Sequence, residues 1–299
     1  MTASAPGSGT VIVTGSSTGL GLETSLYLAE RGFDVYATLR HPDMTADVEK
    51  AAAERGVTLH TWPLDLTDPE SINAAVAGIA GEAGSIFALV NNGGIGLRAC
   101  LEDTTDADMR AVFEANVFGT IAATKAVLPH MRAAGRGRIV TLSSVGGRIS
   151  SFGVSVYCAS KFAVEGLAEG LALEVAPFGI QSILIEPGMI KTTRWTTNRG
   201  TTGRALDPES PYFRLFQASE AVADRVVNRS KTKAPDVAAA IYQALTDEKP
   251  RLRYVVGRPA AAAIKMRRFL PERTFERVYF GPLVKKIAQG VPAAGDGPA

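Results

Sequence analysis

Short apolar runs alternate with amphipathic stretches along most of this chain, and no other feature constrains its fold as strongly. The runs predict strands at residues 11–13, 35–39, 58–64, 87–90, 138–142, 181–185 and 254–256. The stretches between them predict helices at about 20–31, from 68 onward, and at about 106–131, 154–175 and 235–245. Strands that are apolar at almost every position are typical of a parallel sheet covered on both faces. Because crossovers between parallel strands are right-handed, we predict an α/β fold with a Rossmann-type, doubly wound parallel sheet.

The alternation stops after Gly188 and does not resume until Pro235. Loops of that length are usually functional, and this one carries aromatic residues such as Trp195, Tyr212 and Phe216. We predict that residues 192–233 form a lid over a substrate, although the same aromatic side chains would also serve to pack the lid against the body.

No linker divides the chain, so a single domain is expected. Residues 10–291 are predicted to form it, with a helical C-terminal extension. Residues 1–9 and 292–299 are predicted to be flexible ends, the latter because it is rich in Gly, Pro and Ala.

A glycine-rich segment follows the first predicted strand and opens the first predicted helix. Glycines there let the backbone turn tightly and approach a pyrophosphate, which then lies at the positive end of the helix. The spacing is G-x-x-x-G-x-G, so the segment predicts a nucleotide site made of Gly15, Ser17, Thr18, Gly19, Leu20 and Gly21.

The end of the second strand indicates which dinucleotide binds. A carboxylate is expected there when the ribose 2′-hydroxyl is recognised, but the chain has Leu39 followed by Arg40. Leucine accepts no hydrogen bond, whereas a guanidinium suits a 2′-phosphate. We therefore predict NADP (NADPH) as the cofactor in preference to NAD; the alternative is that Arg40 is a solvated residue at a strand end.

Tyr157 and Lys161 lie four residues apart in a predicted helix, with Ser144 upstream. Residues at i and i+4 share one helix face, so the lysine ammonium can lie close to the phenol. A free phenol has a pKa of about 10, and a neighbouring cation lowers that value toward the working range of a general acid/base. Together with the nucleotide segment, this pair predicts a redox enzyme.

Composition excludes several other classes of protein. A net charge of +2 indicates neither nucleic-acid binding nor attraction to acidic surfaces. No metal-ligand spacing occurs around Cys100 and Cys158, which we expect to be reduced thiols rather than a disulfide. The first residues lack the basic and apolar segments of a secretion signal, and no apolar run reaches the roughly 18 residues of a membrane-spanning helix. We predict a cytoplasmic protein.

The motifs taken in order resemble the short-chain dehydrogenase/reductase family. The resemblance runs from about Val11 to Thr192 and weakly onward to Pro271. It rests on Thr14-Gly15-x-x-x-Gly19-x-Gly21, Asp65, Asn91-Asn92-Gly93-Gly94, Asn116, Ser144, Tyr157-x-x-x-Lys161 and Pro187-Gly188-x-x-x-Thr192. The family usually has alanine where this chain has Gly93, which loosens the backbone there but removes no functional side chain.

The resemblance implies a role for each matched residue. Tyr157 would be the acid/base, Lys161 would lower its pKa and bind the nicotinamide ribose, and Ser144 would hold the substrate oxygen. Asn116 would hold a relay water, unless it serves only to bend its helix. The implied cofactor contacts further include Asp65, Leu66, Asn91, Gly93, Pro187, Gly188, Ile190 and Thr192.

Within the family, residues 156–167 look like the 17β-hydroxysteroid and retinol dehydrogenase branch. Ile149 and Phe152, with the lid, then suggest a bulky apolar substrate of steroid or retinoid type. The alternatives are a 3-oxoacyl-type reductase and an NADP-binding regulator without turnover. The family further implies a dimer or tetramer through the two long helices at 106–131 and 154–175.

The C-terminal extension contains a basic and apolar segment, residues 264–270, and a later Lys285-Lys286 pair. A helix of this composition either caps the substrate pocket or lies at an anionic membrane surface.

Overall fold

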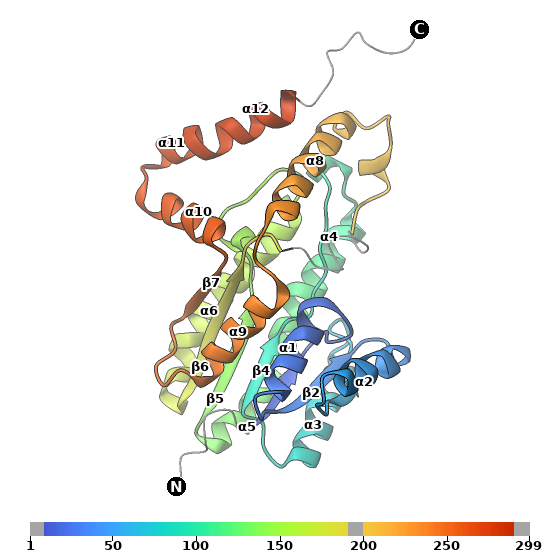
Figure 1. The fold of residues 1–299 in the computed structure, drawn as a ribbon, viewed down its shortest axis with the longest axis vertical. Coiled ribbons are helices and arrows are strands. Elements are labelled where there is room, and N and C mark those ends of the chain that lie inside the picture. The colour runs from blue at the N-terminus through green and yellow to red at the C-terminus, as the bar shows by residue number, and fades with distance from the viewer. Residues whose placement is uncertain (1–8, 191–199, 290–299) are drawn as a thin grey trace.

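The computed structural model describes residues 9–190 and 200–289, which form a parallel sheet covered by helices (Figure 1). The sheet has the strand order β3-β2-β1-β4-β5-β6-β7. Its strands are β1 Thr10–Val13, β2 Asp34–Leu39, β3 His60–Pro63, β4 Ala88–Asn91, β5 Gly137–Leu142, β6 Ile180–Pro187 and β7 Arg253–Val256. All six pairings are parallel. The predicted α/β Rossmann-type sheet is confirmed, and each predicted strand lies in it.

The helices that connect and cover these strands follow the right-handed pattern of a doubly wound fold. They are α1 Gly19–Ala29, α2 Thr45–Glu54, α3 Pro69–Ala83, α4 Asp106–Phe113, α5 Gly119–Ala134, α6 Ser155–Val175, α8 Phe213–Arg229 and α9 Ala234–Thr246. The C-terminal extension adds α10 Arg258–Phe269, α11 Glu272–Phe275 and α12 Gly281–Gln289.

Two hydrophobic cores lie on the two faces of the sheet because successive side chains of a strand point to opposite faces. Val11 and Val13 of β1 pack with α1, α2 and α9 on one face. Ile12, between them, packs with α3, α5 and α6 on the other. Burial on both faces explains why these strands are apolar throughout.

Several helix predictions need correction. The predicted single helix at 106–131 is interrupted by a π-helical turn at Glu114–Phe118, between α4 and α5. The stretch predicted to be irregular contains α8, whose buried residues include Phe216, Val222 and Val227 at helical spacing. With polar residues on its exposed side, this spacing is that of an amphipathic helix, and it was missed beside the Thr-, Gly- and Pro-rich residues that precede it. Helix α2 was not predicted. The third strand is shorter than predicted because β3 is an edge strand that pairs only with β2, over residues 60–63.

The start of α3 agrees with its sequence signals. The side chain of Asp68 accepts a hydrogen bond from Glu70 N, and Pro69 occupies the first turn. An N-cap acceptor and a proline at this place satisfy or remove unpaired N–H groups.

The two cysteines, Cys100 and Cys158, are free and buried.

The helical stretch Asp106–Ala134 is long and apolar enough to cross a membrane by length and composition alone, but half of its most apolar window is buried inside the fold. Ala123, Val127 and Met131 of α5 belong to the core beneath the sheet. The stretch is therefore accounted for as a core helix.

Candidate functional site

The loop between β1 and α1 has the shape of a phosphate cradle. Gly15 and Gly19 have φ of 67° and 62°, values that favour glycine. A Cβ on Gly21 would lie 2.3 Å from Gly15 O, so only glycine fits where the helix meets the loop. Thr18 is the N-cap of α1 but makes no side-chain cap hydrogen bond. The N–H groups of the first turn are thus not capped by Thr18, as an anion-binding helix end requires.

Asn92 ties this loop to the end of β4. Its Nδ2 donates to Thr14 O at 2.8 Å and to Gly15 O at 3.1 Å. In return, Thr14 Oγ1 accepts from Asn92 N and Gly93 N, each at 3.0 Å. These contacts cross the sheet at the β1/β4 switch point, where α/β folds bind their ligands. Neither Thr14 nor Asn92 was among the predicted site residues, although both lie in the motifs that suggested the family.

At the end of β2, Leu39 and Arg40 face different environments. Leu39 is 1% exposed and its side chain points into the core, whereas Arg40 is exposed. The Arg40 Nε donates to His41 Nε2 at 3.0 Å.

Asp65 lies near this strand end. Partial burial opposes its ionisation, but hydrogen bonds from Thr67 N and Oγ1, both at 2.8 Å, together with Arg40 and His41 nearby, hold the pKa of Asp65 below its ordinary value. Asp65, which the family resemblance implies as a cofactor contact, and Arg40, the predicted 2′-phosphate contact, are therefore neighbours.

Three of the predicted catalytic residues meet where β5 ends. Lys161 is only 9% exposed, and its Nζ donates to Leu142 O at 2.8 Å and lies 5.8 Å from the Tyr157 ring centroid. Ser144 Oγ accepts from Gly146 N at 3.0 Å. A Cβ on Gly146 would lie 3.4 Å from Ser144 Oγ and 3.6 Å from Tyr157 Cε1. The hydroxyl, the phenol and the ammonium are therefore close neighbours.

Asn116 lies in the π-helical turn, 1% exposed. Its Oδ1 accepts from Ile95 N at 2.7 Å, and its Nδ2 donates to Ile95 O at 2.9 Å and to Ser160 Oγ at 3.1 Å. Both amide hydrogens are used, so the side chain clamps the segment after β4 to the helix that carries Tyr157. A π-turn of this kind is frequent at functional sites. The structure thus gives Asn116 a positioning contact, whether or not a water binds beside it.

A buried cluster of charged side chains lies behind this site. Glu186 is 0% exposed, and its Oε1 is 2.9 Å from Arg148 Nη1 and 3.0 Å from Arg253 Nε. The same Arg253 Nε donates to Glu165 Oε2 at 2.9 Å. Burial, and then the neighbouring Glu165, raise the pKa of Glu186.

The charged cluster joins the segments that carry the predicted site. Arg148 follows Ser144, Glu165 is one helical turn beyond Lys161, and Glu186 precedes Pro187. None of the charged residues was predicted, because no local motif marks contacts between segments so far apart in the sequence.

The remaining predicted cofactor residues lie at the same edge of the sheet. Asn91 is buried, donates to Thr124 Oγ1 at 3.0 Å, and has an Oδ1 without a hydrogen-bond partner. A Cβ on Gly93 would lie 2.4 Å from Leu66 Cδ1, so the alanine usual in the family would require Leu66 to shift in this chain. Pro187 and Ile190 are buried and Gly188 is half-buried. Thr192 lies outside the described residues.

Within the predicted lid, residues 200–229 pack against the body of the fold. Phe216 is 2% exposed and packs with Ala99 and Ala205, so this aromatic residue serves to pack the lid against the body. Ile149 is also buried, and Phe152 is half-buried. The first residues of the lid, including Trp195, lie outside the described part of the chain.

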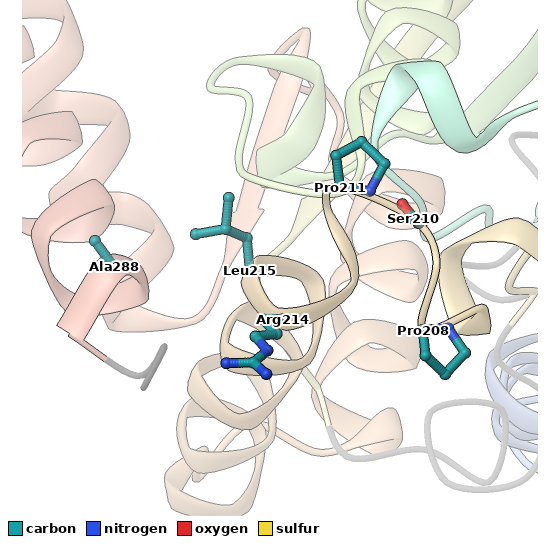
Figure 2. A pocket seen from close by; sticks show the side chains of 6 residues that line it. All are labelled: Pro208, Ser210, Pro211, Arg214, Leu215 and Ala288. Atoms are coloured by element: carbon teal, nitrogen blue, oxygen red, sulfur yellow. The ribbon is translucent and has the colours of Figure 1, made fainter. Parts of the chain in front are cut away.

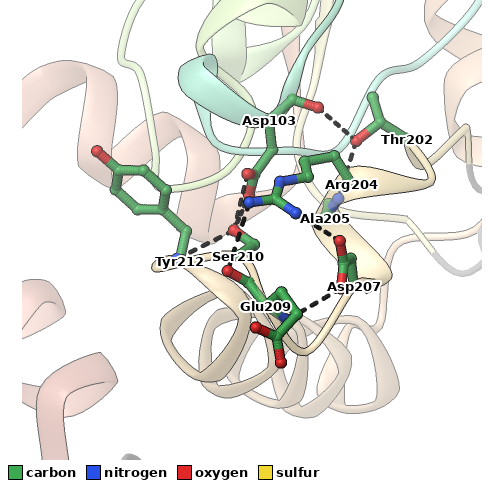
Figure 3. Close-up of polar contacts among 8 residues, drawn as sticks. All are labelled: Asp103, Thr202, Arg204, Ala205, Asp207, Glu209, Ser210 and Tyr212. Carbon is green, nitrogen blue, oxygen red and sulfur yellow. Dashed lines mark hydrogen bonds and ion pairs between the residues drawn. The ribbon is translucent and has the colours of Figure 1, made fainter.

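Asp103, 2% exposed, is the polar anchor of the lid (Figure 3). Ser210 Oγ lies 2.7 and 2.9 Å from its two carboxylate oxygens. The Thr202 hydroxyl donates to Asp103 O at 2.7 Å, and Ser210 Oγ accepts from Tyr212 N at 3.1 Å. Two parts of the lid are thus held by one residue of the segment after β4.

A cleft of about 510 Å³ opens between the start of α8 and the end of α12 (Figure 2). Its lining residues are Pro208, Ser210, Pro211, Arg214, Leu215 and Ala288. Ser144 and Tyr157 do not line it. The cleft is lined by residues of the segment before α8, of α8 and of α12, and none of them is a predicted catalytic residue.

Comparisons with known proteins agree with the fold. The family model described as short chain dehydrogenase matches residues 9–202. The uncharacterized oxidoreductase YusZ of Bacillus subtilis is 35% identical over 271 residues, covering 89% of this chain and 95% of that protein. Human 17-beta-hydroxysteroid dehydrogenase type 1 is 34% identical over 264 residues, covering 86% of this chain and 80% of that protein.

Solved structures give the same result. A short-chain dehydrogenase from Streptomyces avermitilis superposes with a TM-score of 0.75 at 32% identity, covering 95% of this chain and 98% of the other. A gluconate 5-dehydrogenase from Burkholderia cenocepacia, in complex with NADP and tartrate, gives 0.68 at 25% identity, covering 85% and 95%. A Burkholderia phymatum short-chain enzyme in complex with NAD gives 0.76 at 22% identity, covering 92% and 95%, and shows the fold alone.

Proposed function

This chain belongs to the short-chain dehydrogenase/reductase family of oxidoreductases, which act on alcohol and carbonyl groups with a nicotinamide cofactor, and we propose that it uses NADP(H) to interconvert a bulky apolar alcohol and its ketone or aldehyde. The observation that carries this proposal is the meeting of Ser144, Tyr157 and Lys161 at the end of β5, on the same sheet edge as the glycine-rich cradle.

The residues at this edge fit a dinucleotide. The uncapped first turn of α1 would hold the pyrophosphate, and the pair Asp65 and Arg40 would meet the adenosine end. The unpartnered Oδ1 of buried Asn91 is an acceptor left for a ligand. Lys161 and the segment from Pro187 onward would hold the nicotinamide half. The bound cofactor supplies or accepts the hydride.

The chain's own residues would handle the proton. In the direction of oxidation, Tyr157 accepts the hydroxyl proton of the substrate as the hydride leaves the same carbon; in reduction it donates that proton to the carbonyl oxygen. The buried ammonium of Lys161 favours the phenolate form that the first direction needs. Ser144 Oγ acts as acceptor toward Gly146 N, so its hydrogen remains for donation to the substrate oxygen.

The preference for NADP rests on the contrast at the end of β2. Leu39 is withdrawn into the core, so no carboxylate stands where the ribose 2′-hydroxyl would be recognised. The exposed guanidinium of Arg40 carries the charge that attracts a 2′-phosphate. Direct titration of the purified protein with NADPH and NADH tests this: equal affinity for the two would contradict it.

Two observations support an apolar substrate: the similarity to a named relative and the packing of the predicted lid. The relative named 17-beta-hydroxysteroid dehydrogenase type 1 acts, by its name, on a hydroxysteroid. Residues 200–229, packed through Phe216 and Ser210 against the segment after β4, would give the site an apolar side suited to such a molecule.

The test of function is NADPH oxidation, with NADH alongside, across steroids, retinoids, aliphatic aldehydes, aromatic ketones and 3-oxoacyl thioesters. Turnover on one bulky apolar class supports the proposal. Turnover on 3-oxoacyl thioesters alone would replace it with an oxoacyl reductase. Tight NADPH binding without turnover on any compound would favour a regulator.

We also propose a homo-oligomer formed through α4, α5 and α6. Phe118 and Phe162, on this helical layer, are 54% and 47% exposed, and Leu173 is 80% exposed. Exposed side chains of this size on neighbouring helices suit a protein interface. Light scattering of the protein and of a Phe162→Ser variant would test it; a monomeric parent protein would refute the assignment.

A further inference from the structure

The C-terminal arm, which we define as residues 258–289, carries a charge unlike that of the rest of the chain. It contains eight Lys and Arg against two Glu, a formal net charge of +6. The whole chain has +2, so the remaining residues together carry −4. All eight basic residues of the arm are exposed: Arg258, Lys265, Arg267, Arg268, Arg273, Arg277, Lys285 and Lys286.

Large apolar side chains are exposed among these charges. Phe269 is 73% exposed, Val284 is 60% exposed and Val278 is 51% exposed. In α10, Arg258, Lys265 and Phe269 are spaced by seven and four residues and therefore share a face. Ala260, on the opposite side of that helix, is buried. The exposed face of α10 is thus both basic and apolar.

The arm is anchored by a few residues, so its outer surface has a defined orientation. Phe275 is fully buried and stacks on Tyr279 with ring centroids 5.1 Å apart. Ile287 of α12 is buried, and α12 packs against α8. Figure 1 shows α10, α11 and α12 standing off the end of the sheet beside α8. Their outer sides face away from the body.

The basic charge of the arm and its exposed apolar side chains together indicate which kind of partner it binds. Pairing of the arm with the same arm of a second copy would bring together two surfaces of charge +6, which like-charge repulsion opposes. A nucleic acid would neutralise the basic residues but leave Phe269, Val278 and Val284 in water. An anionic bilayer offers both phosphate charges and an apolar layer beneath them.

We propose that the C-terminal arm docks the protein on an anionic membrane surface, with the basic residues at the lipid phosphates and Phe269 inserted among the acyl chains. The arm lies on the surface and does not span the membrane. The docking is independent of the reaction proposed above, because it uses neither the cofactor site nor Tyr157.

The test is co-sedimentation of the full-length protein with vesicles, without cofactor or substrate. We expect binding to phosphatidylcholine vesicles that contain phosphatidylglycerol, little binding to pure phosphatidylcholine, and loss of binding as salt is raised. Phe269→Ser should weaken binding roughly tenfold. Lys265→Gln with Arg268→Gln should weaken it about 25-fold, at roughly fivefold for each charge.

Matched substitutions elsewhere separate the arm from general surface effects. Leu101→Ser removes a side chain that is 61% exposed in the segment before α4, and Lys50→Gln with Lys231→Gln removes two exposed charges outside both the arm and the proposed oligomer helices. Both controls should bind like the parent protein.

Other results overturn the proposal. Equal binding to vesicles with and without phosphatidylglycerol would overturn it, and so would unchanged binding of Phe269→Ser and of Lys265→Gln with Arg268→Gln. Retention on duplex DNA without vesicle binding would reassign the arm to nucleic acid. Self-association lost in Phe269→Ser without vesicle binding would reassign it to a second copy of the chain. None of these results bears on turnover, so the reaction and the membrane proposal stand or fall separately.

Discussion

The buried charged cluster behind the site makes a quantitative prediction about stability. Replacing Arg253 by Met removes the group that bonds Glu186 Oε1 at 3.0 Å and Glu165 Oε2 at 2.9 Å. Both carboxylates are buried, at 0% and 5% exposure, and one oxygen of each already lacks a hydrogen-bond partner. Removing one partner of a buried ion pair costs about 3–5 kcal/mol, and here the charge left uncompensated is that of Glu165, because Glu186 keeps Arg148 at 2.9 Å.

The matched control is Arg55→Met. Arg55 also contacts two carboxylates, Glu30 at 2.5 Å and Glu23 at 3.4 Å, but its side chain is 35% exposed and that of Glu30 is 29% exposed. An exposed pair of this kind contributes about 0–1 kcal/mol. Urea unfolding followed by circular dichroism would measure both variants against the parent protein. Equal losses for the two variants would refute the reasoning, since only burial distinguishes them.

The same cluster predicts a pH dependence. The pKa of Glu186 is raised above the ordinary 4.5, first by burial and then by Glu165. A raised pKa means that folded Glu186 holds its proton at pH values where the unfolded chain has released it. Its contribution to stability is therefore present below 4.5 and is lost as the pH rises through the raised value. Glu186→Gln should reduce this loss, and unfolding curves across that pH window would show it; an unchanged pH profile would contradict the assignment.

Further predictions concern the site itself. Tyr157→Phe should lower turnover by about 100- to 10,000-fold while NADPH binding, followed by fluorescence, stays close to that of the parent; retained turnover would exclude Tyr157 as the acid/base. Arg40→Met should weaken NADPH binding roughly tenfold or more and leave NADH binding unchanged, as measured by titration. Gly21→Ala should weaken the binding of both NADPH and NADH, because the added Cβ would lie 2.3 Å from Gly15 O and displace the glycine-rich loop. Ser210→Ala should cost about 1–3 kcal/mol in urea unfolding, since it leaves the buried carboxylate of Asp103 without its hydroxyl donor.

Much of the fold could be predicted from the sequence because its determinants are local. A strand buried on both faces must be apolar along its length, and Val11, Ile12 and Val13 show that pattern directly. The tight turn at Gly15 and the i, i+4 spacing of Tyr157 and Lys161 are likewise features of a few consecutive residues. Such patterns predicted the strands, the nucleotide loop and the proximity of the phenol and the ammonium.

Helix α8 shows where local reading failed. Its buried residues recur at helical spacing with charged residues on the exposed side, so the amphipathic pattern was present and was missed beside the Thr-, Gly- and Pro-rich residues before it. What the sequence did not indicate is where the helix packs: Phe216 lies against Gly153 and Ala99, which come from other parts of the chain.

The sequence by itself determined the sheet, the glycine cradle and the helix that presents Tyr157 and Lys161, since each follows from the geometry of neighbouring residues. Only the tertiary structure decided how these parts are held together: Asn92 on Thr14, Asp103 on Ser210, and Arg148 and Arg253 on Glu186. Each of those contacts joins residues far apart in the chain, and a polar side chain gives no sign in the sequence of which distant partner will neutralise it. Burial makes the partner necessary, and only the folded arrangement of the strands and helices brings the two within hydrogen-bonding distance.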